Sequence, residues 1–168
     1  MNKLFLTAGL VAGALLAVSA GPAAAQRRGV PGTTKTWTAS ANPYTGTVSR
    51  GRSVSNPYTG RTVATGSQYN PYTGSSRQGV VAGNPYTGRV AGAGQSYNGL
   101  TGTYGQRAGA HNAYTGASAT RGSSYNQYTG TYRSGAQSYN PYTGTYRAGG
   151  TRYNPYTGAH GAAGVVVR

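Results

Sequence analysis

The 168-residue sequence contains no Asp, no Glu and no Cys. Paired-carboxylate catalysis, a Ser-His-Asp triad and carboxylate sites for Mg²⁺ or Ca²⁺ all need an acidic side chain, and disulfides and thiol chemistry need Cys. The two His residues, His111 and His160, stand in Gly-rich surroundings, and we interpret them as spacers rather than metal ligands. The sequence therefore predicts a protein that is not an enzyme, with no catalytic residues, no metal site and no cofactor.

Large aliphatic side chains are also scarce. After residue 25 they comprise ten Val and Leu100, with no Ile, Met or Phe, and Trp37 is the single Trp. This content is far below the level of about 20% under which a charged chain is expected to be disordered. Burying one such side chain contributes about 1.5–3 kcal/mol, whereas ordering the backbone costs about 1–2 kcal/mol for every residue. A conventional globular core is therefore not expected.

Residues 1–25 have the pattern of a secretory signal peptide with a helical apolar segment. Lys3 precedes a mostly apolar run over 4–20, and three small residues at 23–25 follow a Gly-Pro break. This order of positive, apolar and small-residue regions predicts cleavage before Gln26 and no stable membrane span after cleavage. We expect the mature protein to be secreted, periplasmic or located at the cell surface.

A tandem repeat occupies most of the remaining chain. Nine copies of a pentapeptide start 14 residues apart without insertion or deletion. Complete Asn-Pro-Tyr-Thr-Gly copies begin at Asn42, Asn56, Asn70, Asn84, Asn140 and Asn154, and degenerate copies begin at Asn98, Asn112 and Asn126. Constant spacing indicates either a repeated structural unit or recent duplication of one segment. The predicted organisation is a signal peptide (1–25), a basic irregular lead-in (26–41) and the array of nine repeats (42–167), with no globular domain.

The pentapeptide has the composition of a β-turn. Asn can hydrogen-bond the backbone two residues on, Pro presets φ near −65°, and Gly accepts the left-handed conformation. A four-residue loop from Pro to Gly would join two antiparallel strands. The candidate turn residues are Asn42, Pro43, Tyr44, Thr45 and Gly46 in the first copy and Asn140, Pro141, Tyr142, Thr143 and Gly144 in the eighth.

Counting outward from the eighth copy pairs Asn140 with Thr145 and Tyr139 with Tyr146, an aromatic cross-strand pair. A second four-residue loop over 148–151 would continue the pattern. It would divide each spacer into two very short strands.

The second loop would also place Arg147 opposite Arg152 and Tyr146 opposite Tyr153. Repetition of this geometry predicts a single row of tyrosines on one face, spaced by seven residues. The members of the predicted row are Tyr125, Tyr132, Tyr139, Tyr146 and Tyr153.

Three fold classes are compatible with the repeat. We favour a mostly disordered, turn-rich, low-complexity chain, followed by a meander of short antiparallel β-hairpins, and then a β-solenoid with one 14-residue coil per repeat. The early copies lack the tyrosine pairing, and the Val residues are scattered instead of forming the aliphatic file that a solenoid interior needs.

Positive charge without compensating acid predicts anionic partners. Arg makes planar, bidentate contacts with phosphate, sulfate or carboxylate, and its positions drift within the repeat, which favours diffuse electrostatics over a dedicated binding face. The candidate polyanion contacts are Arg61, Arg77, Arg89, Arg107, Arg121, Arg133, Arg147 and Arg152. We expect an anionic polysaccharide or another envelope polyanion as partner, with extracellular DNA as a further possibility.

Together these features predict an exported, non-enzymatic repeat protein that serves as a structural or matrix component of the cell envelope or extracellular space. It would associate with itself through Tyr and adhere to polyanions through Arg. The composition of 42–158 resembles that of low-complexity bacterial secreted repeat proteins and of extracellular structural proteins. The alternative is a polysaccharide or cell-wall binding module that uses the row of Tyr side chains as a platform.

Overall fold

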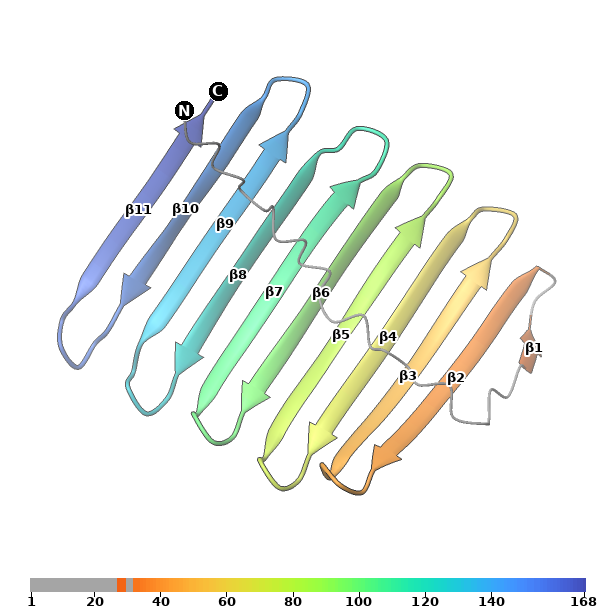
Figure 1. Ribbon diagram of the computed structural model, residues 1–168, viewed down its shortest axis with the longest axis horizontal. Helices are drawn as coiled ribbons and strands as arrows, with labels where there is room; N and C mark the ends of the chain where they lie inside the picture. Colours follow the sequence, from red (N-terminus) through yellow and green to blue (C-terminus); the bar gives the residue numbers. More distant parts are fainter. Residues whose placement is uncertain (1–26, 30–31) are drawn as a thin grey trace.

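The computed structural model describes residues 27–29 and 32–168, which form one antiparallel sheet (Figure 1). The predicted signal-peptide helix and its cleavage site lie outside the described residues. Eleven strands follow one another across the sheet in the order of the sequence. They are β1 (Arg27–Gly29), β2 (Thr33–Asn42), β3 (Thr47–Asn56), β4 (Arg61–Asn70), β5 (Ser75–Asn84), β6 (Arg89–Asn98), β7 (Thr103–Asn112), β8 (Ser118–Asn126), β9 (Tyr132–Asn140), β10 (Thr145–Tyr153) and β11 (His160–Val167).

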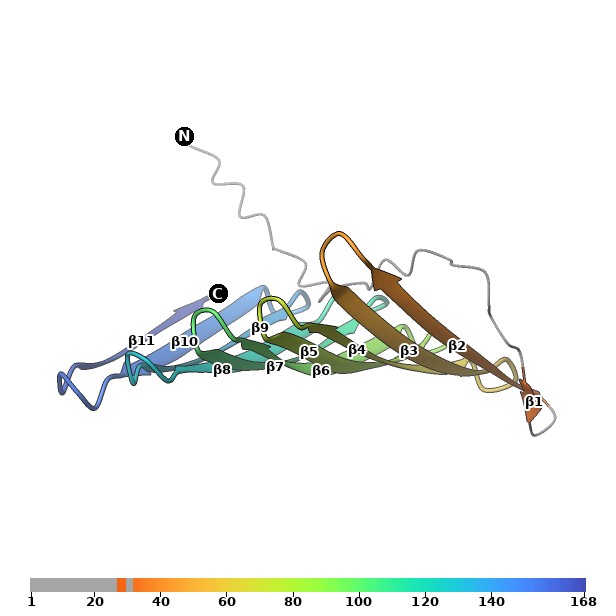
Figure 2. The ribbon, with the colours of Figure 1, turned by 90° about the horizontal axis from the view of Figure 1, so that it is seen from below.

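The sheet is a single layer. Seen from its edge it is twisted, with no second sheet or helix packed on either face within the described part of the chain (Figure 2). No hydrophobic side chain of the described residues is buried. Among these residues, the structure contains no helix long and apolar enough to cross a membrane. The scarcity of aliphatic side chains is thus reflected in the absence of a core.

Of the three fold classes, the structure has the antiparallel hairpin meander. Neither the disordered chain nor the β-solenoid is found among the described residues, because each strand pairs in register with its neighbours along nearly its whole length. The early repeats, which lack the tyrosine pairs, are equally regular: Val54 lies opposite Val63. The segment predicted as an irregular lead-in contains β1 and β2, and it continues the sheet.

Each repeat consists of one strand and one turn, so the second loop predicted over 148–151 is wrong. These residues lie inside β10. Two strands of three or four residues would each be marginal, whereas one long strand pairs with both neighbours. The register around the eighth turn is confirmed, since Asn140 lies opposite Thr145 and Tyr139 opposite Tyr146.

The residues predicted to face each other across that loop have other partners. Arg147 lies opposite Ser138 of β9 and Val166 of β11. Tyr153 lies opposite Tyr132 and not Tyr146, because both Tyr146 and Tyr153 belong to β10. The predicted pairing of Arg147 with Arg152 is therefore wrong.

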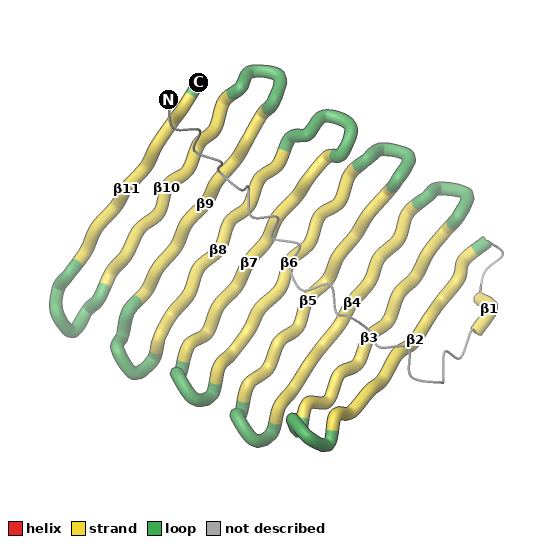
Figure 3. Tube along the Cα trace, in the orientation of Figure 1, coloured by secondary structure: helices red, strands yellow, loops and turns green. Residues whose placement is uncertain are grey.

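The turns have the predicted geometry and alternate between the two sides of the sheet at which the strands begin and end (Figure 3). We call these two sides the edges of the sheet. In the first copy, the Asn42 side-chain oxygen accepts hydrogen bonds from the backbone N–H groups of Tyr44 (2.9 Å) and Thr45 (3.2 Å). Gly46 closes the turn with φ 68°, and the closing Gly of every later copy also has positive φ. This left-handed conformation explains why the last position is always Gly.

Turns that share an edge are two repeats apart and contact one another. The Asn84 side-chain amide donates to the Thr59 carbonyl (3.0 Å), and the Tyr86 hydroxyl donates to the Pro57 carbonyl (2.9 Å). The Tyr86 ring lies over Gly60, where a Cβ atom would be 2.6 Å from the ring. The same amide-to-Thr bond is made by Asn70, Asn126 and Asn154. Similar ring-over-glycine contacts are made by Tyr58, Tyr72, Tyr114, Tyr128 and Tyr156.

We call this set of contacts the turn stack. It gives the Asn, Tyr and Gly of the pentapeptide a function between turns as well as within them. An insertion in one spacer would displace a turn from its partner on the same edge. The constant 14-residue period keeps turns that are two repeats apart in position for these contacts.

The turn stack can be tested with two glycines that have the same φ of 63°, Gly130 and Gly144. A Cβ atom at Gly130 would lie 2.5 Å from the Tyr156 ring, whereas one at Gly144 would meet nothing within 4 Å. We expect Gly144→Ala to lower the free energy of unfolding by about 1–2 kcal/mol through backbone strain alone. Gly130→Ala should lower the free energy of unfolding by more than this, because the new methyl group would also clash with the Tyr156 ring. Equal losses of the two variants in urea unfolding would contradict the turn stack.

Candidate functional site: the tyrosine ladder and the arginines

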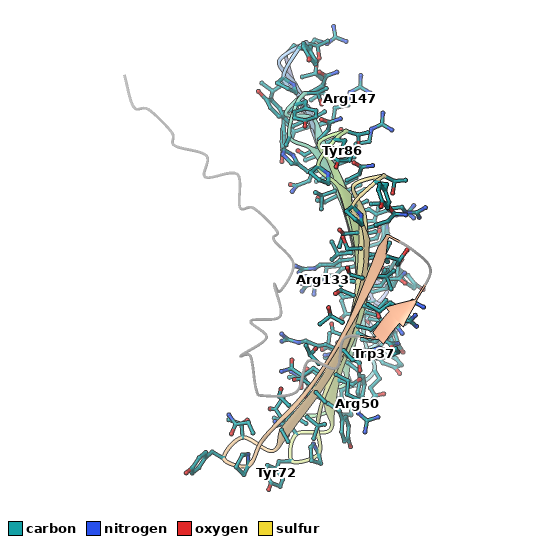
Figure 4. All side chains as sticks on the ribbon, turned by 90° about the vertical axis from the view of Figure 1, so that its right-hand side faces the viewer. Trp37, Arg50, Tyr72, Tyr86, Arg133 and Arg147 are labelled. Carbon is teal, nitrogen blue, oxygen red and sulfur yellow. The ribbon has the colours of Figure 1, made fainter. Side chains whose placement is uncertain are left out.

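Side chains project from both sides of the single layer (Figure 4). Because successive residues of a strand point to opposite faces, the strand register assigns each side chain to one face. We call face A the one that carries Trp37 and Tyr104, and face B the one that carries Arg133 and Tyr146. Both faces are open to solvent.

Five tyrosines form a continuous row on face A, which we call the tyrosine ladder. Tyr97 of β6 lies opposite Tyr104 of β7, and the row continues through one residue on each following strand to β10. Its members are Tyr97, Tyr104, Tyr125, Tyr132 and Tyr153. Tyr97 is half-buried, whereas Tyr104 and Tyr153 are 40% and 50% exposed, so the ladder is accessible from Tyr104 to Tyr153.

The predicted row of five tyrosines is therefore corrected in its membership. Tyr125, Tyr132 and Tyr153 belong to the ladder, but Tyr139 and Tyr146 face each other on face B, at the other end of β9 and β10. Tyrosines seven residues apart pair when they flank a turn. When they lie on one strand, as Tyr132 and Tyr139 do, the odd separation puts them on opposite faces. The spacing around the turn also identifies Tyr97 and Tyr104, which the predicted row omitted.

A row of amide and hydroxyl side chains runs beside the ladder on face A. Gln78, Gln95 and Gln106 lie opposite one another on β5, β6 and β7. Gln95 accepts a hydrogen bond from the Tyr104 hydroxyl (2.7 Å), and Gln106 donates to the Ser123 hydroxyl (2.9 Å). Beyond this row, small and mostly apolar residues, interrupted by two arginines, line a shallow trough across the strands. Face A thus combines an aromatic row, a hydrogen-bonding row and an apolar band.

Glycines occupy the middle of face B, a feature that the sequence analysis did not detect. The row is Gly51, Gly66, Gly79, Gly94, Gly122, Gly135 and Gly150, interrupted by Arg107. A Cβ atom at Gly150 would lie 2.8 Å from the Ser134 carbonyl oxygen, so a side chain is crowded there. The signal in the sequence is a period of 28 residues, which separates Gly51 from Gly79 and Gly66 from Gly94.

The eight candidate arginines divide equally between the faces. Face A carries Arg61, Arg89, Arg121 and Arg147, and face B carries Arg77, Arg107, Arg133 and Arg152. The structure does not bring them into one patch. It does place Arg133 directly opposite Arg152. Like charges in this position repel, and no acidic side chain exists in the sequence to neutralise them.

Trp37 and Arg52 form a separate contact at the β2 end of face A. They lie opposite each other, with the guanidinium carbon 4.6 Å from the centre of the indole ring. This is a cation–π contact. It shows that an arginine in this sheet can be held by an aromatic neighbour in place of a carboxylate.

No metal-binding group of three suitable side chains occurs in the part of the chain that the structure describes. Comparison of the chain with protein-family models, with curated proteins and with solved structures gives no match. The two faces of the sheet are therefore the surfaces on which a function can be sought.

The contribution of the ladder to stability can be measured by comparing Tyr125→Ala with Tyr69→Ala. Tyr125 lies between two tyrosines, whereas Tyr69 lies between Val48 and Ser76 in the equivalent row. We expect Tyr125→Ala to lower the free energy of unfolding by about 0.2–1 kcal/mol more, because Tyr125 has two favourable cross-strand pairs and Tyr69, through Val48, has one. Equal losses in urea unfolding would show that the ladder adds nothing beyond single side chains.

Proposed function

We propose that the protein is an exported, non-enzymatic structural component of the cell envelope or extracellular space, which associates with itself and adheres to polyanions. The observation that carries the proposal is the single-layered sheet with no buried hydrophobic side chain among the described residues. Such a sheet exposes its aromatic and apolar rows on its surface. Extended exposed apolar surface is typical of proteins that bind other surfaces.

Face A is the surface best suited to self-association. The hydrogen-bonding row separates its aromatic ladder from a band of small residues that includes Ala93, Ala108 and Ala119. Sheets stack at about 10 Å when the side chains between them are small or interdigitate. A second copy stacked on face A would bury the ladder and this band together.

Self-association predicts that the purified mature chain, residues 26–168, forms fibres or gels as its concentration rises, without added ligand. The double variant Tyr104→Ser/Tyr132→Ser removes two ladder rings and should raise the concentration needed for assembly, as measured by sedimentation and light scattering. Tyr44→Ser/Tyr142→Ser, which removes two exposed turn rings, is the matched control. A wild-type chain that remains monomeric at all concentrations would contradict this part of the proposal.

Adhesion to polyanions is supported by arginines on both faces. The opposed residues Arg133 and Arg152 offer two guanidinium groups to one phosphate, sulfate or carboxylate, and an anion there would relieve their repulsion. The other arginines add sequence-independent attraction. Export makes envelope and extracellular polyanions the available partners.

The arginine pair can be tested against a sulfated polysaccharide at several salt concentrations. Arg133→Gln/Arg152→Gln and Arg61→Gln/Arg89→Gln each remove two charges, but only the first removes opposed arginines. Binding of all variants should weaken as salt rises. The first double variant should bind more weakly than the second at every salt concentration. Equal affinities would indicate that only total charge matters.

A second candidate function is binding of an uncharged polysaccharide. It is favoured by the position of Gln95 and Gln106 beside the tyrosine ladder, since sugars are bound by aromatic rings together with hydrogen-bonding side chains. Retention on a neutral glycan at high salt by a stable monomer would support this function. Loss of that retention in Tyr104→Ser/Tyr132→Ser would locate the binding at the ladder.

A further inference from the structure

Thirteen of the sixteen tyrosines of the chain belong to two sets with different surroundings, five in the ladder and eight in the turns. Those of the ladder lie on adjacent strands, directly opposite one another, where Cβ atoms are about 4.5–5.5 Å apart. Those of the turns are about two strand spacings, or roughly 10 Å, from the neighbouring turn tyrosine on the same edge, and six of the eight lie over the closing glycine of the preceding turn. Only the ladder, and the pair of Tyr139 and Tyr146 on face B, bring phenol rings to neighbouring positions.

The sequence offers an oxidant few other targets. It has no Cys, and its single Met, Met1, precedes the predicted cleavage site. These are the two residue types that ordinarily react first with oxidants. The single Trp, Trp37, lies on β2, far along the sheet from the ladder on β6–β10, and it has Arg52 over its ring (Figure 1). One-electron oxidation of the exported chain is therefore directed to tyrosine.

We propose that the tyrosine ladder is a site of oxidative cross-linking, at which a peroxide acting through a peroxidase-type one-electron oxidant joins opposed tyrosines as dityrosine. Each of two tyrosines loses one electron and its phenolic proton to give a phenoxyl radical. The two radicals form a carbon–carbon bond between ring positions next to the oxygens, and the hydrogen at each of these carbons moves to the oxygen as the rings regain aromaticity. Two electrons and two protons are lost in total, and they reduce one hydrogen peroxide to two waters.

The ladder is suited to this reaction because its rings are both adjacent and accessible. Tyr104, Tyr125 and Tyr132 are each 40–42% exposed, so an oxidant can reach them. A bond between any two neighbours joins adjacent strands covalently, in a sheet that has no disulfide and no buried hydrophobic side chain among its described residues. Within one molecule, these cross-links would stabilise the fold in the way that disulfides stabilise small secreted domains.

The wild-type protein provides the first test. The chain of residues 26–168, which contains all eleven strands, is treated at low concentration with peroxidase and hydrogen peroxide, and the monomer is recovered by size exclusion. Tryptic cleavage after arginine separates 90–107, 122–133 and 153–168. We expect dityrosine to join 90–107 to 122–133 through Tyr104 and Tyr125, and 122–133 to 153–168 through Tyr132 and Tyr153. Bonds that map to turn tyrosines such as Tyr128 and Tyr156 would overturn the proposal.

Two sets of substitutions provide the second test. Tyr104→Phe, Tyr132→Phe and Tyr146→Phe together leave no directly opposed tyrosines in the described sheet while keeping every ring. The matched control, Tyr44→Phe, Tyr72→Phe and Tyr142→Phe, removes three turn hydroxyls. The first variant should lose the intramolecular dityrosine fluorescence, and the control should keep it. Circular dichroism before oxidation verifies that both variants fold.

Oxidation should also raise the urea midpoint of the wild type and the control but not that of the ladder variant. Equal dityrosine yields in the two variants would refute the ladder as the cross-linking site. The inference rests on the same ladder as the proposed function, but the experiments can refute either one without the other. Assembly of concentrated protein without any coupling in oxidised monomers would overturn only the inference, and coupling in a chain that never assembles would overturn only self-association.

Discussion

The turn stack fixes the register on which the remaining structure depends. Each repeat Asn holds its own turn through its side-chain oxygen, and four of the nine also hold the preceding turn on the same edge through the side-chain amide, as Asn126 does with Tyr128 and Thr101. Because the turns are aligned, the register between neighbouring strands is the same across the sheet. Rows of side chains then run straight across the sheet, and the tyrosine ladder and the glycine row are both consequences of this alignment.

The sequence predicted the turns and the pairing next to them but not the full strands. Asn140 and Tyr139 could be paired because a turn determines its immediate partners. The Gly-rich stretch 148–151 resembles a second turn in its composition. Composition alone does not distinguish a flexible loop from a strand that contains Gly because a larger side chain would be crowded by its neighbours. The distinction comes from the neighbouring strands: Gly150 lies between Gly135 of β9 and Ala163 of β11, in the interior of β10.

The small number of aliphatic side chains predicted the missing core, but the inference of disorder from it was wrong. Burial in a globular interior is not the only source of free energy that can offset the conformational entropy lost on folding. In this sheet the backbone hydrogen bonds, the cross-strand pairs and the turn contacts recur in successive repeats. Val54 opposite Val63 and Tyr125 opposite Tyr132 stabilise neighbouring strands without a second layer. Such nearest-neighbour terms accumulate with the number of repeats.

The single layer also explains why arginines are tolerated on both faces without any acid. In a layered protein one face of a sheet is buried, and a charge there needs a partner. Here both faces meet solvent, so four of the candidate arginines can lie on each. An acidic residue in a spacer would lie one strand from an arginine and pair with it, which would withdraw that arginine from external anions. Because the sequence has no Asp or Glu, no acidic side chain pairs with an arginine on either side of the sheet.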